Sequence, residues 1–158
     1  MFKKLSIVSA GIILGALCVV LPATPAAAST VYCDSTLTEA AESGKVVVPA
    51  HAGSYKCYLF EGDGPNAGVK ALQHTINLCY LEGGYLGPFG VPSSPKLTED
   101  GQFGAKTKAA LVAVQKEYNS QDDENIDTDG SYGPQTYNST SFATTSGNNC
   151  SLTLSSWN

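Results

Sequence analysis

Arginine is missing from this 158-residue chain, whose positive side chains are nine lysines and, when protonated, two histidines. If the N-terminal leader described below is removed, seven lysines remain against fourteen acidic residues, giving a net charge of −7. A surface without arginine lacks the bidentate donor that recognises phosphate and base edges, and an acidic field repels polyanions. These absences argue against nucleic acid and anionic membranes as partners.

Histidine is scarce, with only His51 and His74, and neither a CxxC nor a GxSxG motif occurs. A zinc hydrolase needs clustered ligands around an open metal position, and a serine triad needs a histidine beside its nucleophile. The stretch SSPK at 93–96 matches the SxxK nucleophile motif, but Pro95 prevents the helical turn that this motif requires. We therefore predict that the protein is not an enzyme and holds no cofactor.

One stretch resembles half of a calcium-binding loop. In NIDTDG at 125–130, Asn125, Asp127 and Asp129 occupy alternate positions and a glycine follows at the sixth. The twelfth position, where such a loop has a bidentate glutamate, is Thr136. We therefore predict no metal site.

The N-terminus has the pattern of a secretory signal peptide. Lys3 and Lys4 precede an apolar run from about Leu5 to Leu21, and Pro22 ends this run shortly before AAA at 26–28. A membrane span needs about 20 apolar residues, which this run does not reach. We expect residues 1–28 to be removed together with Cys18, leaving a secreted, extracellular protein of one domain that is free of the membrane.

Four cysteines remain after the leader, namely Cys33, Cys57, Cys79 and Cys150. An even number in an exported chain indicates two disulfides, for which three pairings are open from the sequence. Long loop closures constrain the unfolded chain most, which favours Cys33–Cys57 together with Cys79–Cys150.

The chain contains a short internal repeat. DGQFGAKTKAAL at 100–111 and DGSYGPQTYNST at 129–140 share the spacing of Asp-Gly, an aromatic residue, a second glycine and a threonine. Upstream, VKALQHTIN at 69–77 aligns with LVAVQKEYN at 111–119, which places Gln73 on Gln115 and Asn77 on Asn119. We interpret this pattern as a tandem pair of half-repeats, each a helix followed by an Asp-Gly corner.

The spacing of apolar residues predicts the helices. Residues 69, 72, 76, 79 and 80 fall on one helical face, and residues 107, 111, 114 and 118 repeat that spacing, so both stripes are expected in the core. Each Asp-Gly pair favours a tight turn. Phe103 and Tyr132 are expected to point inward as plugs of these corners, and Pro134 suits a first helical position.

Four blocks occur in the order found in a known family: VKALQHTIN (69–77), DGQFGAKTKAAL (100–111), LVAVQ (111–115) and DGSYGPQTY (129–137). The chain from about Gly62 to Phe142 resembles the peptidoglycan-binding domain family of bacterial cell-wall hydrolases. The resemblance implies a mainly α fold, a small three-helix bundle that holds wall polymer without cutting it. Such modules usually accompany a separate catalytic domain.

The predicted organisation is a signal peptide (1–28), an N-terminal extension (29–61), a peptidoglycan-binding-like domain (62–142) and a C-terminal tail (143–158). In the extension, residues 46–48 and 55–60 are predicted to be short extended segments paired as a β-hairpin. We expect the two disulfides to staple the fold, Cys150 to fasten the tail, and Trp157 to pack within that tail.

The leading functional hypothesis is a secreted, non-catalytic, monomeric module that binds the glycan or stem peptide of peptidoglycan beside the Asp-Gly corners. The alternative is a protein-interaction module, an inhibitor or partner of a secreted cell-wall hydrolase. The loop at 83–95, rich in proline and glycine, is either a solvated excursion or an aromatic stacking surface. Candidate ligand-binding residues, chosen for predicted exposure, are Tyr85, Phe89, Gln102, Lys106, Gln135 and Tyr137.

Overall fold

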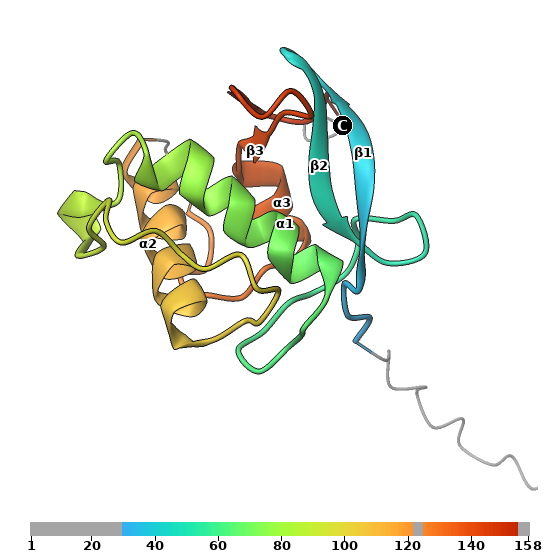
Figure 1. Cartoon of the computed structure of the whole chain (residues 1–158), viewed down its shortest axis with the longest axis horizontal. Helices are drawn as coiled ribbons and strands as arrows, with labels where there is room; N and C mark the ends of the chain where they lie inside the picture. The colour runs from blue at the N-terminus through green and yellow to red at the C-terminus, as the bar shows by residue number, and fades with distance from the viewer. Residues whose placement is uncertain (1–29, 122–124, 155–158) are drawn as a thin grey trace, which may run out of the picture.

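A computed structural model describes residues 30–121 and 125–154 of the chain (Figure 1). The predicted signal peptide, residues 122–124 and Trp157 lie outside the described residues. Within the described ranges, no helix is both long and apolar enough to cross a bilayer.

An antiparallel hairpin opens the described chain. β1 (Ser35–Ala41) pairs with β2 (Gly44–Ala50), and the side chains of Val46 and Val48 alternate onto the buried face of β2. The predicted strand at 46–48 is therefore confirmed. Its predicted pairing with 55–60 is wrong, because β1 is its partner.

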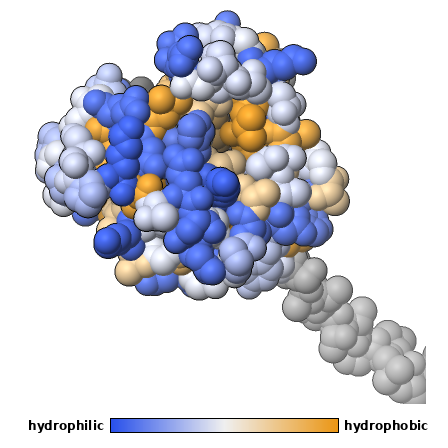
Figure 2. Space-filling model, in the orientation of Figure 1, coloured by the Kyte–Doolittle hydropathy of each residue, from blue (hydrophilic) through white to orange (hydrophobic). Residues whose placement is uncertain are grey.

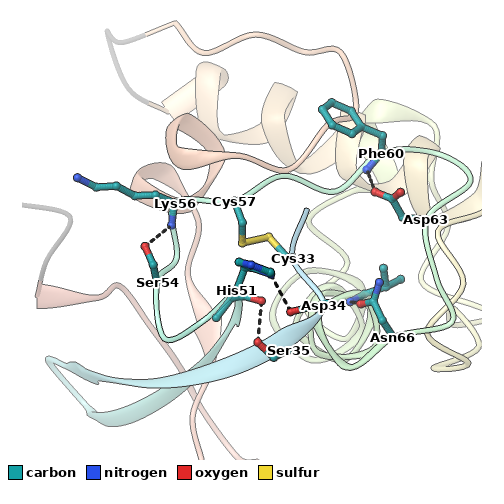
Figure 3. The surroundings of a disulfide bond; sticks show 12 residues. Cys33, Asp34, Ser35, His51, Ser54, Lys56, Cys57, Phe60, Asp63 and Asn66 are labelled. Atoms are coloured by element: carbon teal, nitrogen blue, oxygen red, sulfur yellow. Dashed lines mark hydrogen bonds and ion pairs between the residues drawn. A yellow bond between two sulfur atoms is a disulfide. The ribbon is translucent and has the colours of Figure 1, made fainter. Parts of the chain in front are cut away.

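Residues 55–60 run instead beside the chain that leads into β1. Tyr58 N donates to Val31 O and Cys33 N donates to Tyr58 O, each at 2.9 Å. The Cys33–Cys57 disulfide joins the same two segments (Figure 3). Leu59 exchanges hydrogen bonds with Tyr132 on the other edge of this segment, so its backbone has no free edge to offer β2.

The C-terminal segment belongs to the β structure. β3 (Phe142–Ala143) pairs with β4 (Cys150–Ser151), and bridges join Val46 to Thr144 and Ala41 to Thr153. The segment predicted to be a tail thus extends the hairpin, and Cys150 fastens it as expected.

Both disulfides have the pairing that loop closure favours, Cys33–Cys57 and Cys79–Cys150, so this prediction is confirmed. Two disulfides indicate an oxidising environment of the extracellular type.

The first helical stretch is α1 (Ala67–Thr75), which continues as the π-helix η1 (Ile76–Leu81). Asn66 caps its start, since the side-chain Oδ1 accepts a hydrogen bond from Val69 N at 2.9 Å. The predicted apolar stripe from Val69 to Tyr80 is buried. After η1, the loop contains one short 3₁₀-helix, η2 (Gly87–Phe89).

The second long helix is α2 (Ala105–Gln121), and α3 (Pro134–Ser139) is a helix of six residues with proline at its start, as predicted. Thr107, Leu111 and Val114 are buried on α2, whereas Tyr118, the last residue of that stripe, is only half-buried.

The prediction of a mainly α, three-helix bundle is wrong. The described residues form three α-helices together with two small antiparallel sheets, and the hairpin lies directly against α1 (Figure 1). The helices show a clear 3.6-residue period, whereas strands of two residues leave no detectable pattern. β2 packs on α1 because the two segments share the buried apolar residues of one core.

The two corner rings are confirmed as inward plugs, with Phe103 1% and Tyr132 0% exposed. Tyr132 meets Phe142 edge-on at 6.4 Å between ring centroids, so the second corner packs against β3. Other buried apolar residues that share this core include Leu59, Leu72, Ile76, Leu86, Leu111 and Tyr137.

Candidate functional site

The first Asp-Gly corner (100–104) is held by one buried glutamine of α1. Gln73 Nε2 donates to Asp100 Oδ1 at 3.0 Å and to Gln102 O at 2.9 Å. In return, Gln73 Oε1 accepts from Gly101 N at 2.9 Å. A side chain 2% exposed therefore has both ends of its amide satisfied, which binds the corner to the helix.

The second corner (129–133) is held by Gln115 of α2. Gln115 Nε2 donates to Ser131 O at 3.0 Å and to Thr136 Oγ1 at 3.2 Å, and its Oε1 accepts from Gly130 N at 2.9 Å. The glutamines aligned in the sequence thus make matching hydrogen bonds to matching corners.

Two asparagines extend this match by one helical turn. Asn77 exchanges two hydrogen bonds with the backbone of Leu97, at 3.0 and 2.8 Å. Asn119 does the same with the backbone of Ile126, each at 2.9 Å. Each helix therefore holds both its corner and the segment that precedes that corner.

The segment at 59–63 joins the two corners. Leu59 exchanges a pair of backbone hydrogen bonds with Tyr132, each at 2.9 Å. Farther along, Gly62 N donates to Phe103 O and Phe103 N donates to Asp63 O, both at 2.8 Å. The Asp63 carboxylate also accepts from Phe60 N at 2.7 Å, which shapes the turn between these contacts (Figure 3).

A groove lies beside each corner. The second-corner groove has a volume of about 400 Å³, and the first-corner groove has a volume of about 340 Å³. The lining of the second-corner groove includes Tyr58, Phe60, Asp127, Asp129, Gly133 and Gln135. The lining of the first-corner groove includes Leu97, Thr98, Asp100, Gln102, Gly104 and Lys106.

Aromatic rings distinguish the second-corner groove. Tyr58 and Phe60 lie nearly parallel, with an interplanar angle of 5° and centroids 6.0 Å apart, and Tyr32 meets Phe60 edge-on at 6.0 Å. Tyr32 is 52% and Tyr58 38% exposed, so these rings form a surface that solvent reaches. A Cβ placed on Gly133 would lie 2.7 Å from the Tyr58 ring, so glycine permits this close packing.

The two grooves also differ in charge. Asp127 and Asp129 line the second-corner groove, and none of its described lining residues is basic. The lining of the first-corner groove includes one acidic residue, Asp100, and one basic residue, Lys106. The Gln102 N–H and the Gln73 amide donate to Asp100 and hold the pKa of its carboxyl below the ordinary 3.8.

The candidate residues from the sequence fall in several places. Gln102 and Lys106 line the first-corner groove, and Gln135 lines the second. Tyr85, 56% exposed, lines a separate cavity of about 390 Å³ beside the Cys79–Cys150 disulfide. Phe89 is partly buried against the core.

Tyr137 corrects the predicted exposure. It is 0% exposed and stacks on Tyr55 with ring centroids 4.0 Å apart. Tyr137 therefore belongs to the core, where it also contacts the ring of Phe142 at 5.6 Å between centroids.

A further cavity, of about 340 Å³, lies between β2, α1 and the segment that follows β3. Its walls include Val47, Ala71 and Ala143, with Lys70 and a His74–Glu99 contact of 3.1 Å at the rim. Figure 2 shows the apolar surface gathered near the hairpin amid mostly hydrophilic residues.

Sequence reasoning missed Tyr58 and Phe60, because it treated 55–60 as half of a hairpin. Residues i and i+2 of an extended segment point to one side, so the Tyr58–Phe60 spacing was the signal for a shared aromatic face. Across residues 30–121 and 125–154, no group of three or more histidine, cysteine or acidic side chains could hold a metal ion.

Comparison with protein-family models, curated proteins and solved structures gave no match to this chain.

Proposed function

We propose that this chain is a secreted, non-catalytic module that binds peptidoglycan in the second-corner groove. The observation behind the proposal is the ring pair of exposed Tyr58 and half-buried Phe60, which lines a groove of about 400 Å³. The apolar face of a sugar ring stacks on an aromatic ring, while hydroxyl and amide groups bond to polar neighbours. Gln135 and Asp127 supply such neighbours in the same groove.

The sequence blocks that resemble the peptidoglycan-binding family support the proposal. The matched bonds of Gln73 and Gln115 support a tandem repeat as the origin of the two corners. In this view, duplication produced two grooves, and the chain at 58–60 added its aromatic rings to the second.

The make-up of the groove supports a binding role without catalysis. Thr136 Oγ1 donates to Ser131 O at 3.1 Å and accepts from Gln115, and the described lining places no histidine beside a serine or threonine. A hydroxyl engaged in this way lacks the adjacent base that would activate it as a nucleophile.

The test is sedimentation of the mature protein with purified, polysaccharide-stripped bacterial wall. We expect binding at low salt and about tenfold weaker binding for Tyr58→Ala. An aromatic ring that a ligand covers on binding contributes about 1–2 kcal/mol in such sites. Tyr85→Ala is the matched control, because it removes an equally large exposed tyrosine from a different cavity.

Failure of the wild-type protein to co-sediment would overturn the proposal. Equal binding by Tyr58→Ala with a loss in Tyr85→Ala would move the site to the disulfide cavity. A stable complex with a secreted cell-wall hydrolase, without wall binding, would establish the alternative function.

A further inference from the structure

The second-corner groove combines aromatic faces with negative charge, and this combination selects one kind of ligand group. We propose that the groove is a subsite for a primary ammonium group, which Tyr58 and Phe60 contact with their rings and Asp127 pairs with its carboxylate. The inference rests on the proposed function and specifies which part of the wall polymer enters the groove.

The rings provide the first component. A cation within about 6 Å of an aromatic centroid is attracted by the negative face of the ring. Tyr58 and Phe60 present nearly parallel rings to the same groove, and Tyr58 remains 38% exposed. A flexible aminoalkyl chain can therefore lie along the rings with its ammonium group at one face.

Asp127 provides the second component. Its backbone N–H donates to Gln135 Oε1 at 3.2 Å, while no described residue forms a hydrogen bond or ion pair with its carboxylate. Asp129, by contrast, accepts from Ser131 N at 2.7 Å and serves the corner itself. The Asp127 carboxylate is exposed, so an incoming cation can pair with it without a large desolvation cost.

The first-corner groove is an internal comparison. Counted from the two Asp-Gly pairs, Thr98 takes the place of Asp127, and Lys106 takes the place of Gln135. Its described lining has no aromatic residue. A lysine at the rim repels an ammonium group, so the preference belongs to the second corner alone.

Two parts of peptidoglycan have this chemistry. One is the side-chain amino group of a diamino acid in the stem peptide, and the other is the amino group of a glucosamine that lacks its acetyl group. The stem peptide is favoured, because its amine lies at the end of an aliphatic chain long enough to cross the rings.

The experiment compares two peptides by calorimetric titration of the mature protein. Nα-acetyl-Lys-D-Ala-D-Ala has a free ε-ammonium group, and Nα,Nε-diacetyl-Lys-D-Ala-D-Ala does not. We expect the first peptide to bind about five- to tenfold more tightly, with the preference shrinking in 1 M salt. Asp127→Asn should reduce this preference to about twofold or less, because only the rings then attract the ammonium group.

Glu42→Gln is the matched control, since it removes one exposed negative charge from the turn between β1 and β2. Tyr58→Leu is a second variant, which keeps apolar bulk but removes the ring, and should reduce the preference about threefold. Near-UV circular dichroism of each variant establishes that it is folded.

A third probe separates the two sources of amine. If glucosamine trimer binds in an Asp127-dependent manner and the lysine peptide does not bind, the result supports the ammonium subsite and shows that the sugar supplies the amine. If neither amine affects binding, the inference is overturned. Wall sedimentation distinguishes failure of this inference from failure of the proposed function. If only the inference fails, N-acetylated wall binds the protein as well as untreated wall does. If the proposed function fails, neither wall binds it.

Discussion

At the scale of single residues, Gln73 and Gln115 fix the positions of the two corners. A primary amide offers donors and an acceptor on one short side chain, so it satisfies the N–H and C=O groups that a tight turn leaves unpaired. A leucine of similar size at Gln73 would leave the buried Gly101 N without its partner and would remove one of the two hydrogen bonds that Gln102 O accepts. Each such loss costs about 1–3 kcal/mol, which explains why polar residues occupy a core position on each helix.

Tyr132 of the second corner carries a polar group, its phenol hydroxyl, into the core. Its hydroxyl is buried and has no hydrogen-bond partner among the described residues, and burial raises the pKa of this phenol well above 10. We predict that Tyr132→Phe increases the free energy of unfolding by about 1 kcal/mol, since it removes an unsatisfied polar group. Phenylalanine already fills the corresponding place in the first corner, at Phe103.

Urea unfolding at pH 7 measures this change. Phe103→Tyr is the reciprocal variant, and it should be destabilised because it introduces a hydroxyl where the first corner has none. A clear loss of stability in Tyr132→Phe would contradict the prediction.

Asp100 makes the stability of the first corner depend on pH. Hydrogen bonds from Gln102 N and from the Gln73 amide lower the pKa of this carboxyl below 3.8 in the folded state. A lowered pKa stabilises the fold above the unfolded value and loses that contribution as the pH falls through the folded value. We therefore predict that Asp100→Asn is less stable than the wild type at pH 6, and that the difference shrinks below pH 3.8.

Urea midpoints of both proteins between pH 2 and pH 6, taken as about one-unit steps, test this dependence. Glu42→Gln controls for the general effect of removing one acid. A difference that stays constant over this pH range would refute the assignment to Asp100.

At the scale of elements, short segments far apart in sequence complete one β structure. β3 has two residues, yet its neighbour Thr144 bridges to Val46 of β2, and Thr145 N donates to Lys45 O at 2.8 Å. Such short strands are stable only because the Cys79–Cys150 disulfide and the core around Phe142 hold the segment in place.

The two disulfides should differ in their contributions to stability. Cys79 and Cys150 are 71 residues apart and Cys33 and Cys57 are 24 apart. The chain-entropy model gives about 4 kcal/mol for the longer loop and about 3 kcal/mol for the shorter. We predict that the double variant Cys79→Ala/Cys150→Ala loses about 1 kcal/mol more than Cys33→Ala/Cys57→Ala, as measured by urea unfolding without reductant. The reverse order would show that packing around Cys33 outweighs loop closure.

At the scale of the whole molecule, the chain before residue 62 is part of the body that contains both corners. Leu59 pairs with Tyr132, Gly62 with Phe103, and β2 covers α1 (Figure 1). The groove proposed to bind ligand is assembled from this early segment and from the second corner together.

We therefore predict that a fragment of residues 62–142 does not fold alone, whereas residues 30–154 do. The fragment would expose the apolar residues that β2 covers and would leave the Tyr132 backbone without Leu59. A dispersed ¹H–¹⁵N spectrum of the fragment would contradict this expectation, and residues 30–154 prepared in the same way are the control.

Much of the local structure was predictable because its causes are local. The stripe from Val69 to Tyr80, the inward rings at Phe103 and Tyr132, and the helix start at Pro134 follow from helical period and turn chemistry. Of the three disulfide pairings that the sequence left open, the entropy of loop closure favoured the one that the structure has. The partner of β2 did not follow, because strand pairing depends on which backbone edges remain free once the chain has folded.

The same division between local and long-range causes holds for the candidate site. The sequence by itself determined two helices and two Asp-Gly corners, since each depends on residues a few positions apart. It aligned Gln73 with Gln115, but the tertiary structure decided that these side chains hold the corners. Only the tertiary structure decided that Tyr137 is buried and that Tyr58 and Phe60 line the same groove as Asp127. Exposure and the sharing of one groove depend on contacts between segments about 70 residues apart, and the linear order of residues does not specify those contacts.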